Sequence, residues 1–230
     1  MPKVISIHQP NYLPWLGFFY KMYKSDYFVF YDNIQIEHRS QQAYVNRTKI
    51  KTNHGELWLT CPIHIKTGKL IQDVELVKTI NWRKKHLKTL YYNYNRCKYF
   101  TQVYPGIEHL ITHGSNNLCE FNIAIINWII EYLDLPVKVL RASDIPVNET
   151  NPTLRLIKMI EFLGADVYFS GNGARLYQQE ELFEEHGIEL RYTNFRQGDY
   201  LQCYSGFIPR LSVIDALFNL GKETSSLLKQ

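Results

Sequence analysis

The stretch HQPNYLPW, residues 8–15, places one histidine and two side-chain amides directly after the first hydrophobic run of the chain. Histidine is the side chain that most often transfers protons in enzymes, and an amide can orient a reacting group or stabilise an oxyanion. We therefore expect His8, Gln9 and Asn11 to be catalytic, with His8 as the general base. The alternative is a tight loop whose polar groups hydrogen-bond only to its own backbone.

Two prolines stiffen the same stretch. Pro10 and Pro14 fix their own φ angles and bias the residues before them towards extended backbone. The loop is therefore expected to be ordered before any ligand binds. Tyr12 and Trp15 lie within it, and we expect their rings to form a platform on which a substrate can stack.

A second polar group follows the next hydrophobic run, in YDNIQIEHRSQQAYVNRTKI, residues 31–50. Asp32 comes at the end of the predicted strand, and we expect it to be a further catalytic residue. Alternation then predicts a β-ribbon in which Arg39 and Arg47 share one face and hold a phosphate or a carboxylate. The other candidate ligand contacts are Gln35, Gln42 and Asn46. The alternative is a ribbon that simply faces solvent.

Two later stretches could contact an anion. In NWRKKHLKTL, residues 81–90, Lys85 and His86 belong to the basic first turns of a predicted helix, whose alternative role is a solvated surface. In YFSGNGARLY, residues 168–177, a glycine turn follows a strand and opens a helix, a place that favours anions, although glycines also serve tight turns alone. Its candidate binding residues are Ser170, Gly171, Asn172 and Gly173.

Composition narrows the class of protein. The 230 residues are 45% hydrophobic and carry 26 basic against 22 acidic side chains, for a formal charge of +4. So small an excess of basic over acidic residues argues against dedicated nucleic-acid binding. The apolar runs are too short for a membrane span or a signal peptide, which predicts a cytoplasmic protein without membrane insertion.

The spacing of cysteine and histidine predicts no metal site. The four cysteines lie far apart without a CxxC pair, so they predict no disulfide framework either and favour a reduced setting. His109 and His113 are one helical turn apart, but no third ligand accompanies them. The sequence names no cofactor.

The predicted elements form an α/β fold. Residues 3–8 and 27–32 are typical of buried strands, with a helix at 16–26 between them, and from about residue 137 strands alternate with amphipathic helices. We predict a Rossmann-like, mostly parallel sheet with helices on both faces. A β-ribbon insertion is expected at about 33–80 and a helical segment at about 81–135, in which Pro105 begins a helix. Ser212 and Asp215 are expected to cap the last helix.

This fold predicts where a ligand binds. In sheets of this kind ligands bind outside the carboxyl ends of the strands. The loop at residues 8–15 and the glycine turn near residue 171 both follow predicted strands. We therefore expect the two segments to meet over one edge of the sheet and to form a single cleft.

Several segments, in this order, resemble the WbqC-like protein family. They are ISIHQPNYLPWLGFFYKMYKSDYFVFYDNIQ, LWLTCPI, WRKKHLKTL, GADVYFSGNGARLY, FEEHGIEL and LSVIDALFNLG. The resemblance implies a single WbqC-like α/β domain over residues 1–230 and a place in O-antigen or other surface-polysaccharide biosynthesis. It also implies transfer of an amino acid, notably glycine, to a sugar, and it carries over no catalytic residues.

Together these features lead us to expect a transferase that acylates an amino sugar. Its partners would be a sugar nucleotide and an activated acyl or aminoacyl donor, and a homo-oligomer is compatible with the sequence. One alternative is an ATP-dependent nucleotidyl or adenylyl transferase, because HIGH-type nucleotidyltransferases also place histidines in the first strand–helix loop. This chain has one histidine there rather than an HxGH pair. The other alternative is a non-catalytic sugar-nucleotide-binding module.

Overall fold

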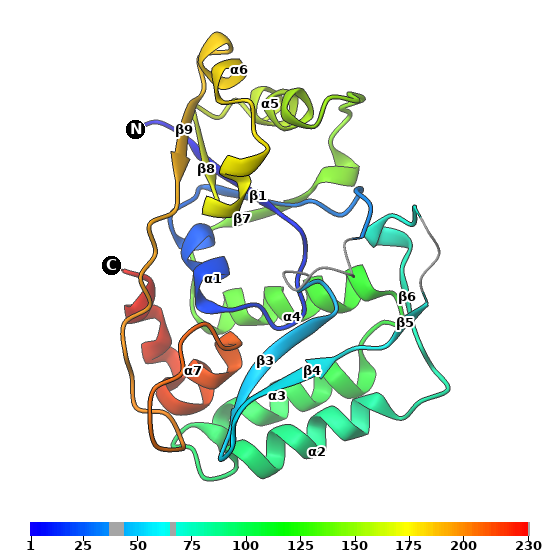
Figure 1. The fold of residues 1–230 in the computed structure, drawn as a ribbon, viewed down its shortest axis with the longest axis vertical. Helices are drawn as coiled ribbons and strands as arrows, with labels where there is room; N and C mark the ends of the chain where they lie inside the picture. Colours follow the sequence, from blue (N-terminus) through cyan, green and yellow to red (C-terminus); the bar gives the residue numbers. More distant parts are fainter. Residues whose placement is uncertain (37–43, 65–67, 230) are drawn as a thin grey trace.

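The computed structural model describes residues 1–36, 44–64 and 68–229, and it contains a five-stranded parallel sheet (Figure 1). The strands, in their order across the sheet, are β7 (Lys138–Arg141), β2 (Tyr27–Phe30), β1 (Val4–His8), β8 (Val167–Ser170) and β9 (Glu189–Tyr192). Every neighbouring pair in the sheet is parallel. The predicted α/β class with a mostly parallel sheet is therefore confirmed.

The strand order places a topological switch at the centre of the sheet. From β1 the chain moves outward through β2 to β7, and it then returns to the other side of β1 for β8 and β9. In doubly wound sheets a crevice opens at this point, outside the carboxyl ends of the two central strands. Here the two strands end at His8 and Ser170.

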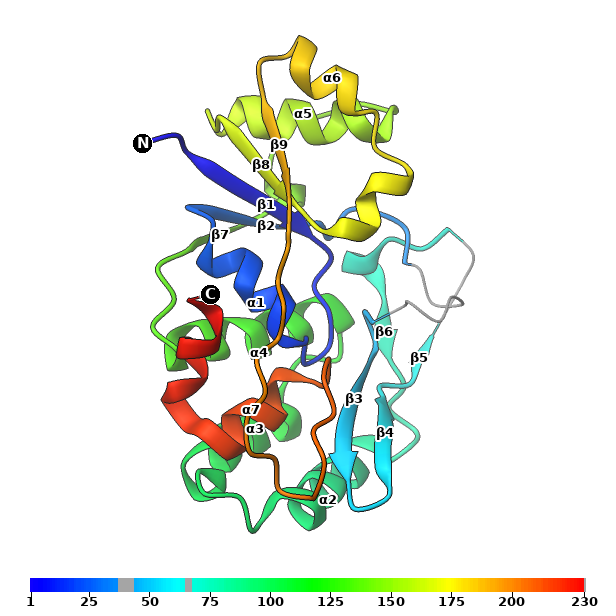
Figure 2. The ribbon, with the colours of Figure 1, turned by 60° about the vertical axis from the view of Figure 1, so that its left-hand side comes forward.

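Helices cover both faces of the sheet, as predicted. On β2, Phe28 and Phe30 point into one core and Val29 into the other, because successive strand residues face opposite sides. The first core is covered by α1 (Leu16–Tyr23), α4 (Leu118–Tyr132) and α7 (Val213–Leu220), and the second by α5 (Pro152–Phe162) and α6 (Glu180–Glu185). Figure 2 shows these two groups of helices on opposite sides of the sheet.

A long insertion separates β2 from β7. It contains one antiparallel ribbon of β3 (Arg47–Thr52) and β4 (Gly55–Thr60), and a shorter one of β5 (Ile63–His64) and β6 (Glu75–Leu76). Its helical part consists of α2 (Trp82–Tyr94), α3 (Phe100–His113) and α4. These elements follow one another in the predicted order, ribbon first and helices second.

One helix start is predicted wrongly. Pro105 lies inside α3, which begins five residues earlier at Phe100. A proline at this position removes one helical hydrogen bond. The helix continues across it because Val103, Ile107 and Ile111 form a fully buried face.

The remaining helical elements are short. They are the 3₁₀ segments Ile71–Asp73, Ala142–Asp144, Asn172–Leu176 and Gly221–Leu228. Among the described α-helices α4 is the longest, with 15 residues, whereas a membrane span needs about 20. None of the helices in the described ranges is both long and apolar enough to cross a membrane.

Residues 9–15, here called the proline loop, are held in place by hydrogen bonds from three elements. The side-chain amide of Asn122 on α4 donates to the Pro10 carbonyl at 2.8 Å. The Leu13 carbonyl accepts hydrogen bonds from Thr48 Oγ1 on β3 (2.9 Å) and from Ser212 Oγ before α7 (2.8 Å). These bonds hold Leu13 at a φ of 41°, a left-handed conformation that is costly for a residue other than glycine. The loop is therefore a rigid element of the structure.

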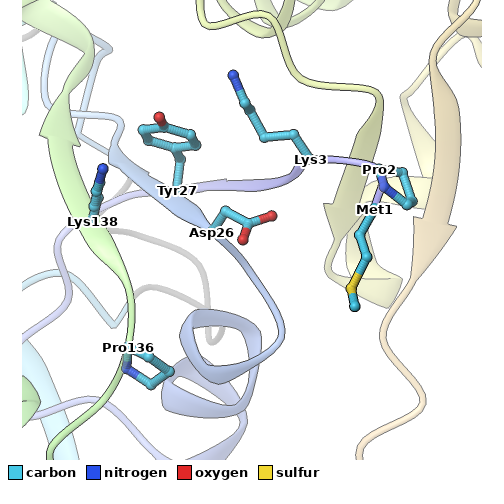
Figure 3. Close-up of a pocket in the computed structure, with 7 residues that line it drawn as sticks. All are labelled: Met1, Pro2, Lys3, Asp26, Tyr27, Pro136 and Lys138. Carbon is cyan, nitrogen blue, oxygen red and sulfur yellow. The ribbon is translucent and has the colours of Figure 1, made fainter.

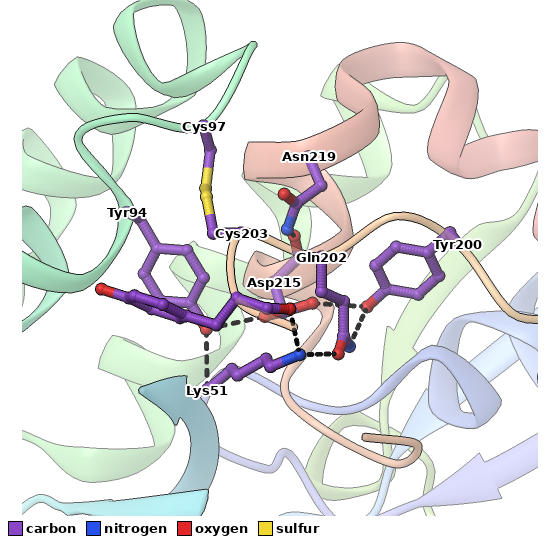
Figure 4. Close-up of a disulfide and its surroundings, with 9 residues drawn as sticks. Lys51, Tyr94, Cys97, Tyr200, Gln202, Cys203, Asp215 and Asn219 are labelled. Atoms are coloured by element: carbon purple, nitrogen blue, oxygen red, sulfur yellow. Dashed lines mark hydrogen bonds between the residues drawn. A yellow bond between two sulfur atoms is a disulfide. The ribbon is translucent and has the colours of Figure 1, made fainter. Parts of the chain in front are cut away.

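A disulfide joins Cys97, which follows α2, to Cys203 in the segment between β9 and α7 (Figure 4). Cysteine spacing predicts no such bridge, and the structure corrects that expectation for this pair. The two residues are 106 positions apart, and only the fold brings their Cα atoms to 5.8 Å. Cys61 and Cys119 are free and buried.

Reduction of this disulfide is expected to lower the free energy of unfolding by about 2–5 kcal/mol, because the bridge restricts the unfolded chain over a long loop. Thermal unfolding with and without a thiol reductant measures the effect. The double variant C97S/C203S is the control, since the reductant should not change its melting temperature. Identical melting temperatures for oxidised and reduced wild type would show that the bridge does not stabilise the fold.

Candidate functional site

A cavity of about 560 Å³ opens at the switch point of the sheet, and we call it the switch-point cavity. His8 and Ser170, which end the two central strands, both contribute to its wall. Residues from the proline loop and from the glycine turn, residues 171–173, also line it. Its volume lies within the range of small-molecule sites, about 300–1,000 Å³. The two segments expected to share one cleft therefore do so.

His8 is held in one tautomer. Its Nδ1 lies 2.9 Å from the carbonyl oxygen of Gln9, which can only accept a hydrogen bond, so Nδ1 carries the proton and Nε2 keeps its lone pair. The imidazole packs edge-on against Phe18, with 5.1 Å between ring centroids. Burial, and then the charge of Lys21, lower the pKa of His8 to about 3. The ring is therefore neutral at pH 7 and able to accept a proton.

Among the polar side chains on the cavity wall, those of Gln9, Asn11 and Lys21 have no hydrogen-bond partner within the described parts of the chain. Asn11 is 8% exposed and Lys21 is 4% exposed. A buried polar group is costly unless a ligand or water satisfies it, so this wall suits a polar ligand. The described residues contain no cluster of three or more histidine, cysteine or carboxylate side chains that could hold a metal ion.

Lys21 is a site residue that the sequence analysis missed. It lies on α1 in LGFFYKMY, where it is the only charged residue in a helix of apolar and aromatic side chains. A lysine in the last turn of so apolar a helix is the signal that could have identified it. Burial lowers the pKa of Lys21 to about 7, far from the ordinary value for lysine.

The glycine turn leaves open space beside the cavity. Gly171 has a φ of −78°, which any residue adopts, and a Cβ on Gly171 or Gly173 would meet no atom within 4 Å. The fold of the turn therefore does not require either glycine. The helix expected directly after the turn is a 3₁₀ segment of five residues, so that part of the prediction is wrong, whereas anion binding at the turn stays a prediction.

Asp32 does not line the cavity. Its carboxylate accepts hydrogen bonds from the backbone N–H of Ser143 (2.9 Å) and from the Ser143 hydroxyl (2.8 Å), and Asp32 is 1% exposed. These bonds join the segments that follow β2 and β7. Asp32 therefore links two loops through hydrogen bonds and does not lie at the predicted catalytic position.

Tyr12 and His86 form a buried pair that does not belong to the cavity wall. The Tyr12 hydroxyl lies 3.1 Å from His86 Nδ1, and the two residues are 0% and 5% exposed. Burial lowers the pKa of His86 to about 4. Because an enclosed ring has no face free for a substrate, the expected aromatic platform is reduced to Trp15, which does line the cavity.

The candidates on the ribbon are not gathered at the cavity. Gln35 is exposed, and the side chain of Asn46 donates to a carbonyl across the ribbon at 3.0 Å. Arg47 lies over an exposed tryptophan ring of β4 at 4.4 Å. Arg39 and Gln42 lie outside the described residues, so a face shared by Arg39 and Arg47 stays a prediction.

Of three further candidates, two lie outside the cavity wall and one is part of it. Lys85 is exposed on α2 and Asn172 is exposed in the glycine turn, and neither is part of the cavity wall. Ser170 is on the wall, where its Oγ accepts a hydrogen bond from the Gln178 side chain at 3.3 Å. Gln178 also lines the cavity and is another residue that sequence reasoning missed.

A second hollow, of about 330 Å³, lies at the opposite, amino-terminal ends of the strands (Figure 3). Its wall includes Lys3, Asp26 and Lys138, which stand at the amino ends of β1, β2 and β7. The Asp26 carboxylate accepts a hydrogen bond from the backbone N–H of Val4 at 2.8 Å. Because parallel sheets bind ligands at the carboxyl ends of their strands, the switch-point cavity is the stronger candidate.

Comparison with known proteins places the chain in a family. A model of the WbqC-like protein family matches residues 9–227. The chain belongs to this family. The uncharacterized protein Rv1507c of Mycobacterium tuberculosis (strain ATCC 25618 / H37Rv) is 31% identical over 233 residues, which cover 99% of this chain and 98% of the relative. No solved structure shows a significant match.

A Gly171→Leu variant of this WbqC-like protein is expected to keep its melting temperature within about 2 °C while ligand binding weakens at least about tenfold. The backbone accepts a side chain at this position, and the side chain would occupy cavity space. Thermal unfolding and ligand titration measure the two effects. Gly187→Ala is the control: its φ of 68° predicts lost stability with unchanged affinity. Unchanged affinity in Gly171→Leu would place the ligand elsewhere.

Proposed function

We propose that this WbqC-like protein transfers an acyl group, notably an aminoacyl group such as glycyl, to the amino group of a nucleotide-linked sugar in surface-polysaccharide biosynthesis. The observation that carries the proposal is His8, a neutral imidazole fixed in one tautomer on the wall of a ligand-sized cavity. A neutral imidazole can accept the proton that must leave an attacking amine, and a bound anionic ligand would raise its low pKa towards the operating pH.

The proposed step forms an amide bond. The sugar amine attacks the carbonyl carbon of a thioester or ester donor, and the new C–N bond leaves a positive charge on nitrogen and a negative charge on oxygen. His8 Nε2 accepts the proton from nitrogen. The C–S or C–O bond of the donor then breaks, and the proton passes from His8 to the leaving thiolate or alkoxide.

The neighbours of His8 suit the charges that this step creates. The side-chain amides of Gln9 and Asn11 lie on the same wall and can donate hydrogen bonds to the developing oxyanion. Trp15 offers a ring against which a sugar can pack. The open space beside Gly171 and Gly173 leaves room for a ligand to approach the backbone closely.

ATP-dependent nucleotidyl or adenylyl transfer is the second candidate, and the strand order favours it. Doubly wound sheets bind nucleotides at the switch point, where this cavity lies. An acceptor oxygen would attack the α-phosphorus of ATP, forming a P–O bond as the bond to pyrophosphate breaks. Release of pyrophosphate therefore distinguishes this reaction from acyl transfer, which needs no ATP when the donor is already activated.

A substrate screen tests the proposal. Amino-sugar nucleotides are incubated with acyl-coenzyme A and aminoacyl donors, with and without ATP, and the products are analysed by mass spectrometry. The proposal predicts an amide product without ATP, and no product when a hydroxyl replaces the amino group of the sugar. Pyrophosphate release would favour the second candidate. Binding of a sugar nucleotide without turnover by any donor would indicate a binding module.

A further inference from the structure

Lys21 is a largely buried lysine without a hydrogen-bond or ion-pair partner in the described protein. It stands on α1, its side chain lines the switch-point cavity, and the residue is 4% exposed. Its Nζ lies 5.9 Å from the centroid of the Phe28 ring, and no hydrogen bond or ion pair reaches it from any residue that the structure describes. Buried charges in proteins are almost always paired, so this ammonium calls for an anion.

The wall around Lys21 supplies no such anion. The titratable groups that face the cavity from the surrounding elements are His8, Tyr31, Tyr44, Tyr168 and Tyr177. None of these groups is a carboxylate, and burial raises the pKa values of Tyr31 and Tyr168 above that of an ordinary tyrosine. Within the described part of the wall, Lys21 is therefore the only group whose protonated form supplies a positive charge near pH 7.

We infer that Lys21 and Asn11 form a subsite for an oxyanion carried by the ligand, a phosphoryl or a carboxylate group. The ammonium supplies the charge, and Asn11, 8% exposed and also without a partner in the described chain, supplies a neutral donor on the same wall. Lysine commonly binds phosphate as a point charge. The inference rests on the proposed function only in taking this cavity as the ligand site, and it requires no transfer reaction.

Anion binding at this subsite is expected to change two protonation equilibria. The charge of Lys21 lowers the pKa of His8, so a bound anion raises that pKa and makes His8 a stronger base. Burial lowers the pKa of Lys21 to about 7, and an anion favours its charged form. Binding therefore takes up a proton, and affinity is expected to fall as the pH rises above 7.

Calorimetric titration of the full chain with inorganic phosphate, uridine diphosphate and acetate tests the subsite. At pH 6.5, Lys21→Met is expected to bind the oxyanion at least tenfold more weakly than wild type. Its melting temperature should rise, because an unpaired buried charge has been removed. Lys24→Met, which removes an exposed lysine from the end of the same helix, should match wild type in affinity. Wild-type affinity should be several-fold weaker at pH 8.5.

The outcomes separate the alternatives. Binding of phosphate or uridine diphosphate assigns the subsite to a phosphoryl group, and binding of acetate alone assigns it to a carboxylate. Equal affinities of wild type and Lys21→Met, or no binding of any probe by wild type, would overturn the inference. A lower melting temperature of Lys21→Met would also overturn it, because the lysine would then stabilise the fold. A transfer assay without product refutes only the proposed function.

Discussion

A His8→Gln variant is expected to keep wild-type stability and ligand affinity while its kcat falls by about 10²–10⁴-fold. Glutamine is similar in size and can still donate a hydrogen bond towards the Gln9 carbonyl, which lies 2.9 Å from Nδ1 in the wild type. It has no atom that accepts a proton at pH 7. The loss should therefore appear in the chemical step, with ligand binding preserved.

Steady-state kinetics and calorimetry with a nucleotide-linked amino sugar and its donor measure the two quantities. His113→Gln is the matched control, because His113 is an exposed residue at the end of α3. A His8→Gln variant with unchanged kcat, or an equal loss in His113→Gln, would remove His8 from the reaction.

The pH dependence of kcat/KM is a second test of His8 as the general base. Burial and the Lys21 charge place the pKa of His8 in the free protein at about 3. The neutral, proton-accepting form is present above that pKa, so kcat/KM should not fall through loss of this base between pH 7 and pH 5. A decline centred near pH 6.5 that is absent from His8→Gln would indicate an ordinary exposed imidazole instead, because protonation of the substrate amine affects both proteins alike.

An Asp215→Ala variant is expected to lose about 3–5 kcal/mol of unfolding free energy. Asp215 is fully buried and accepts hydrogen bonds from the hydroxyls of Tyr94 (2.9 Å) and Tyr200 (2.7 Å). Burial raises its pKa, which the tyrosine hydrogen bonds and the Lys51 charge oppose. Lys51 is 1% exposed and donates to the Gln202 side chain at 3.0 Å (Figure 4). Removing the carboxylate leaves both buried hydroxyls without their acceptor, while the Lys51 ammonium keeps its hydrogen bonds to Gln202 and to the backbone carbonyls of residues 204–206.

Urea unfolding measures the loss, and Glu161→Ala is the control. Glu161 is exposed on α5 and pairs with His186 Nδ1 at 2.7 Å, so its replacement should cost less than about 1 kcal/mol. A loss below about 1 kcal/mol in Asp215→Ala would show that the buried cluster is not a main source of stability. The segment that carries Asp215 also supports the site. Ser212, three residues before Asp215, donates a hydrogen bond to the Leu13 carbonyl of the proline loop.

Local sequence patterns predict the elements of this fold well. The buried runs at β1 and β2, and the helix between them, have the periodicity of their structures, and the parallel sheet follows from the alternation of strands and helices. The prediction that Ser212 caps α7 is confirmed by its hydrogen bond from the Ile214 N–H at 3.3 Å. Asp215 does not complete the expected capping box, because its carboxylate is taken by two tyrosines.

The direction of individual side chains could not be predicted in the same way. His8 ends β1 and Asp32 follows β2, yet His8 lines the cavity while Asp32 binds the backbone of a neighbouring loop. Tyr12 is enclosed by long-range contacts with α2 and α4 that no local pattern encodes. For Lys21, the sequence predicts the helix but not the burial of the side chain, because that burial depends on how α1 packs against the sheet.

The most direct test of the switch-point site is a crystal structure of the chain with a bound nucleotide-linked amino sugar. We expect the ligand in the cavity between the ends of β1 and β8, with its amine within hydrogen-bond distance of His8 Nε2 and an oxyanion beside Lys21. A ligand bound at the opposite edge of the sheet, near Lys3 and Lys138, would contradict this assignment.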